Sequence, residues 1–177
     1  DKDGNRWYLE TPFAIAWSRE NVQFLKTNSG KKGAGMPVVR NPQFNFKEGF
    51  CWTDINSTFL KARLKGKAIF DVVSMSLFSK IDLPDWYFVT LINTTFMSFY
   101  VDNFINNTSH FQINDARQTP IVVPTETQLN SFKSIFDRAY KIKKEQFSGI
   151  VSEEKAEMLL EPIQQELDKL VEELYGV

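Results

Sequence analysis

The chain has very little of the chemistry that metal centres and nucleophilic catalysis require. It holds one cysteine, Cys51, and one histidine, His110. A single cysteine excludes an internal disulfide and favours a reducing compartment, which predicts a cytoplasmic protein. Clustered zinc ligands and a Ser-His-Asp triad are excluded as well, and no convergent carboxylates for metal-dependent phosphodiester cleavage are apparent. We therefore expect no catalytic residue, metal or cofactor in this chain, which would not be an enzyme by itself.

Long hydrophobic runs are also missing. No apolar stretch approaches the roughly 20 residues that a membrane helix needs, and no signal peptide is recognisable, so we expect no membrane partner. The chain begins with Asp1 rather than Met, and we interpret it as a piece of a longer protein. Its 42% hydrophobic residues, with sixteen Phe, predict a folded domain with a sizeable core.

The net charge of −1 conceals an uneven distribution. Residues 1–149 carry 19 Lys and Arg against 14 Asp and Glu, which gives +5, whereas residues 150–177 carry 2 against 8, which gives −6. We therefore divide the chain into a main domain, residues 1–149, and a helical segment, residues 150–177, that packs on it or on a neighbouring domain. The basic body permits a polyanionic partner, although ordinary solvated surface fits the charge equally well.

Period-two patterns predict several strands in the first half. Residues 43–47 and 50–53 alternate around Glu48-Gly49, which predicts a β-hairpin. Residues 69–77 predict another strand. Closer to the start, Trp7, Phe13, Ile15 and Trp17 are compatible with a strand pair, followed by a loop at 28–35.

Helical signals dominate the second half. Asn93 or Thr94 is placed to cap a helix, with Phe96, Phe99, Tyr100 and Phe104 on one face. Short strands are predicted at 111–113 and 121–123.

The Thr125-Glu126-Thr127-Gln128 capping box then begins a long helix that ends near Gly149. Ser152 can start the last helix, in which Pro162 either introduces a kink or begins the second half. Together these elements predict an α+β fold with a mixed, mostly antiparallel sheet and C-terminal helices.

Basic and amide side chains indicate a nucleic-acid partner. Lys31 and Lys32 lie in a glycine-rich loop, and Lys61, Arg63, Lys65 and Lys67 alternate, so an extended segment would place these four charges on one face. A strand edge protected by lysines fits the same pattern. The cations at 138–144 better fit a helix C-terminus. Side chains able to read base edges gather around one predicted strand: Asn106, Asn107, Ser109, His110, Asn114, Arg117 and Gln118.

Four segments resemble a known family. Residues 46–53 resemble the Glu-Gly-Ile-x-Trp-Thr hairpin of TaqI-like, or type IIG, adenine-specific DNA methyltransferases, and residues 91–94 are similar to their Leu-x-Asn-Ser helix start. Residues 113–128 resemble the segment that leads into the conserved helix, and residues 167–177 resemble the terminal Leu-Asp-x-Leu-Val-x-x-Leu-Tyr-Gly-Leu sequence. Thr94 and Val177 depart mildly from these patterns.

The resemblance implies a target recognition domain that binds double-stranded DNA. It also implies a methyltransferase domain in the same polypeptide, where S-adenosylmethionine would bind and adenine N6 would be methylated. Whether a nuclease lies further upstream is left open by the resemblance. One alternative is half of a type I specificity subunit. A second is a protein–protein interaction module that uses exposed Phe and Trp residues.

Overall fold

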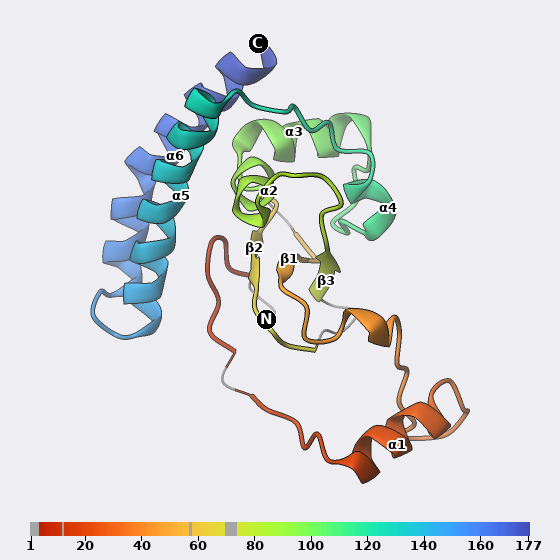
Figure 1. Cartoon of the computed structure of the whole chain (residues 1–177). Helices are drawn as coiled ribbons and strands as arrows, with labels where there is room; N and C mark the ends of the chain where they lie inside the picture. The colour runs from red at the N-terminus through yellow and green to blue at the C-terminus, as the bar shows by residue number, and fades with distance from the viewer. Residues whose placement is uncertain (1–3, 12, 57, 70–73) are drawn as a thin grey trace.

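The structure, a computed structural model, describes residues 4–11, 13–56, 58–69 and 74–177. These residues form six α-helices and a three-stranded antiparallel sheet, which confirms the predicted α+β class. Figure 1 shows the sheet in the middle, α2 and α3 above it, and the long α5–α6 pair along one side. The identity of a DNA-methylase specificity domain stays a prediction.

The central strand β1 (Gly49–Thr53) is buried along its whole length. It pairs with β2 (Ala62–Lys65) on one side and with β3 (Ser74–Leu77) on the other. The predicted hairpin partner, residues 43–47, does not pair with it. Pro42–Phe44 form a short 3₁₀ helix instead, and Phe46 has a φ of 60°. A proline and a left-handed residue cannot continue a regular strand, so the hairpin prediction is wrong and later segments flank β1.

β3 confirms the second half of the strand predicted over residues 69–77. Residues 70–73 lie outside the described residues. Gly49 faces this strand so closely that an added Cβ would lie 2.6 Å from the Leu77 carbonyl oxygen. The start of β1 therefore has room only for glycine.

Two successive helices cover the sheet. The first, α2 (Asp85–Ile92), buries every residue from Tyr87 onward and contacts β1, β2, α3 and α5. The second, α3 (Thr95–Phe104), begins as predicted, with the Thr94 hydroxyl accepting a hydrogen bond from the Met97 N–H at 3.0 Å.

The predicted aromatic face of α3 is not its buried face. Met97 and Val101 point into the core, whereas Phe99 and Phe104 are 60% and 70% exposed. Only Phe96, of the four predicted aromatics, packs against the core. The core receives the neighbouring stripe of Met97 and Val101, while Phe96 packs against Tyr175 of α6.

The two short strands predicted at 111–113 and 121–123 are not formed. Ile113–Ala116 make a short helix, α4, and residues 120–124 are extended without a strand partner. Tyrosine hydroxyls take the place of a strand: Tyr175 donates to the Pro120 carbonyl (2.6 Å) and Tyr87 donates to the Val122 carbonyl (2.8 Å). Prolines at 120 and 124 supply no N–H, which disfavours a ladder here.

The C-terminal part is a helical hairpin, as predicted. α5 (Glu126–Phe147) starts with the Thr125–Gln128 capping box and stops just before Gly149, whose φ is 75°. α6 (Glu153–Tyr175) is capped by Ser152 and runs through Pro162, so the proline does not begin a separate helix. α6 packs on α5 and α3, while the division of the chain at residue 149 stays a prediction.

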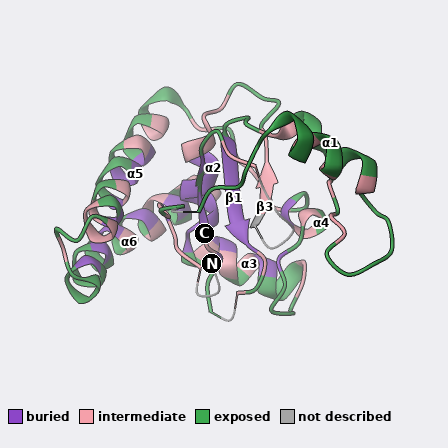
Figure 2. Ribbon diagram, turned by 90° about the horizontal axis from the view of Figure 1, so that it is seen from below, coloured by how far each residue is buried: buried purple, intermediate pink, exposed green. Residues whose placement is uncertain are grey.

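The prediction of an N-terminal strand pair is wrong. Trp7 makes only an isolated bridge to Arg63, residues 13–17 form no strand, and Arg19–Asn28 form a helix, α1, that buries none of its residues. The loop predicted after Asn28 is present. Figures 1 and 2 show α1 exposed and set apart from the α5–α6 pair, at the end of an extended arm.

The core lies between the sheet and the helices. Figure 2 shows buried residues concentrated on β1, α2 and the facing sides of α5 and α6. In the described part of the chain, no helix has both the length and the apolar character needed to span a membrane.

Candidate nucleic-acid interface

Residues 106–118 form a fixed loop and short helix rather than a strand. The Asn106 side chain donates to the His110 carbonyl and to the Asp115 carboxylate, both at 3.0 Å, and accepts from the Thr108 N–H at 2.9 Å. The same carboxylate accepts from the Gln112 N–H at 2.8 Å, which completes the cap of α4. Local hydrogen bonds therefore determine the shape of this segment.

The end of β1 holds the loop against the body. The Asn56 N–H donates to the Ser109 carbonyl (2.7 Å), and the Phe111 N–H donates to the Asp54 carbonyl (2.8 Å). His110 Nδ1 lies 3.0 Å from a carboxylate oxygen of Asp54. Below them, the buried Trp52 indole donates to the Phe111 carbonyl at 2.7 Å. A loop tied this way can present side chains without rearranging.

Most of the predicted base-reading side chains lie at the surface on this frame: Asn107, Ser109, His110, Asn114, Arg117 and Gln118 are exposed. Asn106 is different, because it is partly buried and its amide already bonds within the loop. Part of the Gln118 amide is also used, since its nitrogen donates to the Asn114 carbonyl at 3.0 Å. The structure thus brings the seven residues together and makes Asn106 a positioning residue.

The alternating cations of residues 61–67 do not form one exposed face, which corrects that prediction. Arg63 and Lys65 do share a face of β2, but they are only 4% and 8% exposed. The Arg63 guanidinium donates to the Thr53 hydroxyl at 2.9 Å, and burial lowers its pKa. Lys65 donates to the carbonyls of Lys47 (2.7 Å) and Ala68 (2.9 Å), and burial lowers its pKa also. Both cations are therefore used inside the fold.

The remaining predicted cations are spread out. Lys61 is half-buried just before β2 and Lys67 is exposed beyond its other end, so the two flank opposite ends of the strand. Lys31 and Lys32 are exposed in the loop after α1, and Figure 1 shows that loop on the arm, away from α4. No compact basic patch forms from the predicted set.

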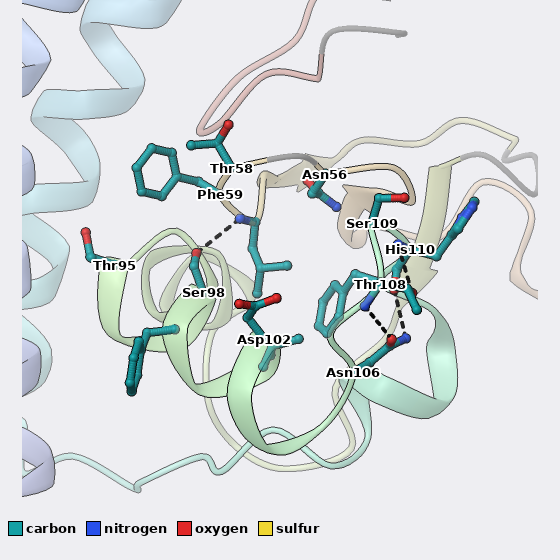
Figure 3. Close-up of a pocket in the computed structure, with 14 residues that line it drawn as sticks. Asn56, Thr58, Phe59, Thr95, Ser98, Asp102, Asn106, Thr108, Ser109 and His110 are labelled. Carbon is teal, nitrogen blue, oxygen red and sulfur yellow. Dashed lines mark hydrogen bonds between the residues drawn. The ribbon is translucent and has the colours of Figure 1, made fainter.

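A hollow of about 280 Å³ adjoins the loop. Its walls come from residues 56 and 58–60, from α3 and from residues 106 and 108–111, and they include Asn106, Ser109 and His110 of the predicted set. Figure 3 shows Asp102 of α3 pointing toward this space, with Phe59 on one side and Asn56 and Ser109 on the other.

The α3 wall of this hollow was not predicted from the sequence. Thr95, Ser98, Phe99 and Asp102 recur at helical spacing and all line it. This spacing was visible in the sequence, but the prediction considered Phe99 only as part of an aromatic face.

A second hollow, of about 640 Å³, lies between residues 8–11 and the start of α2. Its walls carry the carboxylates of Glu10, Glu48 and Asp85, and burial followed by the nearby Glu48 charge raises the pKa of Asp85. Negative charge here disfavours phosphate, so this hollow is a poor site for nucleic acid.

Residues of the family-like segments hold the fold together. The Asn93 side chain is 1% exposed and pairs with the backbone of Ala62 in both directions, accepting from its N–H (2.8 Å) and donating to its carbonyl (2.9 Å). Gly49 allows the close approach of Leu77 to β1, and the Trp52 indole bonds to the Phe111 carbonyl. These segments therefore explain how the loop is supported rather than what it contacts.

The fold and loop define an α+β domain with a surface rich in hydrogen-bonding groups. Comparison with protein-family models gives no match, and comparison with curated proteins gives none either.

Proposed function

We propose that this chain is the double-stranded DNA target recognition module of a bacterial N6-adenine DNA methyltransferase or combined restriction enzyme. The observation that carries the proposal is the exposed set on residues 107–118, mounted on a hydrogen-bonded frame. Amide and guanidinium groups of this type read base edges, and a fixed frame lowers the entropy lost on binding. The four family-like segments, in their order along the chain, support the same function.

Arg117, Asn107 and Asn114 are the proposed base readers, with Ser109, His110 and Gln118 beside them. Lys31, Lys32, Lys61 and Lys67 are the proposed phosphate contacts, because backbone contacts give affinity without sequence information. Arg63 and Lys65 are left out because they are buried. Because the proposed base readers lie on residues 107–118, DNA would cross the loop and α4.

The proposal extends to a parent protein. A methyltransferase domain of the same polypeptide would bind S-adenosylmethionine and act on an adenine turned out of the stack, while this module itself performs no chemistry. The α5–α6 hairpin would face that domain. Its α6 surface is acidic, with Glu153, Glu154, Glu161 and Glu173 exposed, so it suits a protein contact better than a DNA contact. Half of a type I specificity subunit would use the same reading surface with separate methylation subunits.

A salt titration tests the proposal. Binding of a fluorescent duplex pool should weaken steeply between 50 and 200 mM salt, because released counterions drive phosphate binding. The double variant Lys61→Gln, Lys67→Gln should flatten the logarithmic slope by about one per lost contact. The matched control, Lys155→Gln, Lys169→Gln on α6, should keep the wild-type slope. No binding, or salt-independent binding, would reject DNA recognition.

A protein-interaction module is the second candidate, because the N-terminal arm exposes large apolar side chains. Phe13 is 94% exposed, Val38 63% and Phe24 48%. Exposed apolar groups gathered on one element are typical of protein interfaces. Pull-down by the arm with little salt dependence, together with no DNA binding, would favour this function.

A further inference from the structure

The hollow beside the loop has the size and the walls of a site for one planar ring system. Its volume of about 280 Å³ is near the lower end of small-molecule pockets, which span roughly 300–1,000 Å³. Phe59 and Phe99 stand at its walls and remain 39% and 60% exposed. The Arg6 guanidinium lies 5.6 Å from the Phe59 ring centre, which limits movement of this ring. Exposed aromatic rings at a cavity wall are suited to stacking with a base.

Two residues that line the hollow, Asn56 and Asp102, have hydrogen-bond acceptors without a donor among the described residues. Asn56 Oδ1 is buried without a partner, and its orientation is fixed because Nδ2 donates to the Thr53 and Asp54 carbonyls at 2.6 and 3.3 Å. Among the described residues, none donates a hydrogen bond to the Asp102 carboxylate or forms an ion pair with it. Asp102 is exposed at the hollow, so a ligand that donates a hydrogen bond can pair with its carboxylate.

Other polar groups of the wall are already committed. Ser98 Oγ accepts from the Leu60 N–H (3.1 Å) and donates to the Thr94 carbonyl (3.1 Å), and the Asn106 amide bonds within its loop. The Asp102 charge also disfavours phosphate inside the hollow. The free carboxylate thus selects a hydrogen-bond donor between aromatic walls.

We propose that this hollow binds an amino-bearing nucleobase, with the base stacking on Phe59 or Phe99 and its amino group donating to Asp102. Adenine, cytosine and guanine carry such an amino group, whereas thymine does not. The base can come from a free nucleoside or from a nucleotide unstacked from DNA, and the second source rests on the proposed function. An unstacked base would then add selectivity that groove contacts alone do not give.

Two sets of probes separate the sources. The first is free adenosine, cytidine and thymidine, followed by NMR shifts of the full chain. The second is a duplex with one unpaired adenine or thymine, compared with the fully paired duplex by fluorescence anisotropy. We expect shifts with adenosine and cytidine but not with thymidine, and about fivefold or tighter binding for the unpaired adenine than for the paired duplex.

Variants assign the effect to the hollow. Asp102→Asn, at an exposed position of α3, should abolish the preference for unpaired adenine over unpaired thymine. Asp82→Asn, an exposed aspartate outside the hollow, should keep it. Equal response to adenine and thymine, an unchanged preference in Asp102→Asn, or no response to any probe would overturn the base site. If the wild-type chain shows the nucleoside shifts but binds no paired duplex, the DNA function is rejected and a nucleoside site remains.

Discussion

Asp168 on α6 accepts two hydrogen bonds from Thr95 at the start of α3, one from its backbone N–H (2.9 Å) and one from its hydroxyl (2.8 Å). The pair joins residues 167–177 to the residue that directly follows residues 91–94, and both of these segments resemble methyltransferase specificity regions. Gln164, one turn earlier, donates to Asp168 at 3.0 Å and to the Asn93 carbonyl at 3.2 Å. The contact fixes α6 against the helix that carries the cavity wall.

Replacing this carboxylate should loosen the helical hairpin. Asp168→Ala removes a charged acceptor from three donors, so we expect the free energy of unfolding to fall by about 1–3 kcal/mol. Urea denaturation measures the loss, with Glu173→Ala as an exposed control on the same helix. DNA affinity well below the unfolding transition should not change, and a large change there would place Asp168 at the interface.

Glycines 49 and 66 offer a matched pair. A Cβ at Gly49 would lie 2.6 Å from the Leu77 oxygen and 2.9 Å from the Phe78 ring, whereas a Cβ at Gly66 meets nothing within 4 Å. Gly49→Ala must separate β1 from β3 and should destabilise by about 1–3 kcal/mol, as overpacking does. Gly66→Ala should stay within about 0.5 kcal/mol of wild type. Similar thermal unfolding of both variants would contradict the close approach at Gly49.

We expect the free energy of unfolding to fall in alkali because of Tyr175. Burial raises the pKa of its phenol from 10.0 to about 12. The folded state therefore holds this proton more tightly, so the stabilisation is complete below pH 10 and is lost as the pH rises toward 12. Tyr175→Phe should be less stable at pH 8, by about 1 kcal/mol for the lost bond to Pro120.

The same variant should also show a shallower decline between pH 10 and 12. Tyr87, whose pKa is raised by burial as well, remains and keeps part of the slope. Parallel curves for wild type and Tyr175→Phe, measured by urea unfolding at each pH, would disprove this assignment.

The buried cations Arg63 and Lys65 should contribute to the free energy of unfolding and not to DNA binding. Arg63→Met and Lys65→Met each leave protein acceptors without their donor, which should cost about 1–3 kcal/mol of unfolding free energy. At temperatures where these variants remain folded, the salt slope of DNA binding should equal that of wild type. A flatter slope in either variant would mean that the replaced residue contacts phosphate.

Arg117 and Asn107 should control sequence preference. Replacing either with Ala removes donors directed at base edges, so we expect relaxed preference at one base pair and a loss of about 1–3 kcal/mol on the preferred site. Binding selection from a randomised duplex pool measures this, with Asn130→Ala on exposed α5 as the control. An unchanged preferred sequence in both variants would mean that another loop reads the bases.

Patterns with local causes were predictable from the sequence. The caps at Thr94, Thr125 and Ser152 and the stop before Gly149 depend on hydrogen bonds and φ angles within a few residues, and all are present. The exposed polar character of residues 107–118 also followed from their composition.

Long-range pairing was not predictable in the same way. Alternation around Glu48-Gly49 suggested a hairpin, but β1 pairs with segments that follow it in the chain. Residues 121–123 had strand composition, yet a tyrosine of α2 donates to the Val122 carbonyl and a tyrosine of α6 to the neighbouring Pro120 carbonyl. β propensity records only that a residue fits a half-buried pleated surface, and it does not say which partner is present.

By itself, the amino-acid sequence determined the α+β class, the start and end of the last two helices, and the kinds of side chain gathered at residues 106–118, because these depend on neighbours along the chain. Only the tertiary structure decided which charges face solvent. Arg63 and Lys65 alternate in sequence like surface cations, but β2 lies between β1 and the Trp7 segment, which buries them. It likewise placed Asp102 opposite Asn56, because burial and cavities arise from contacts between distant segments.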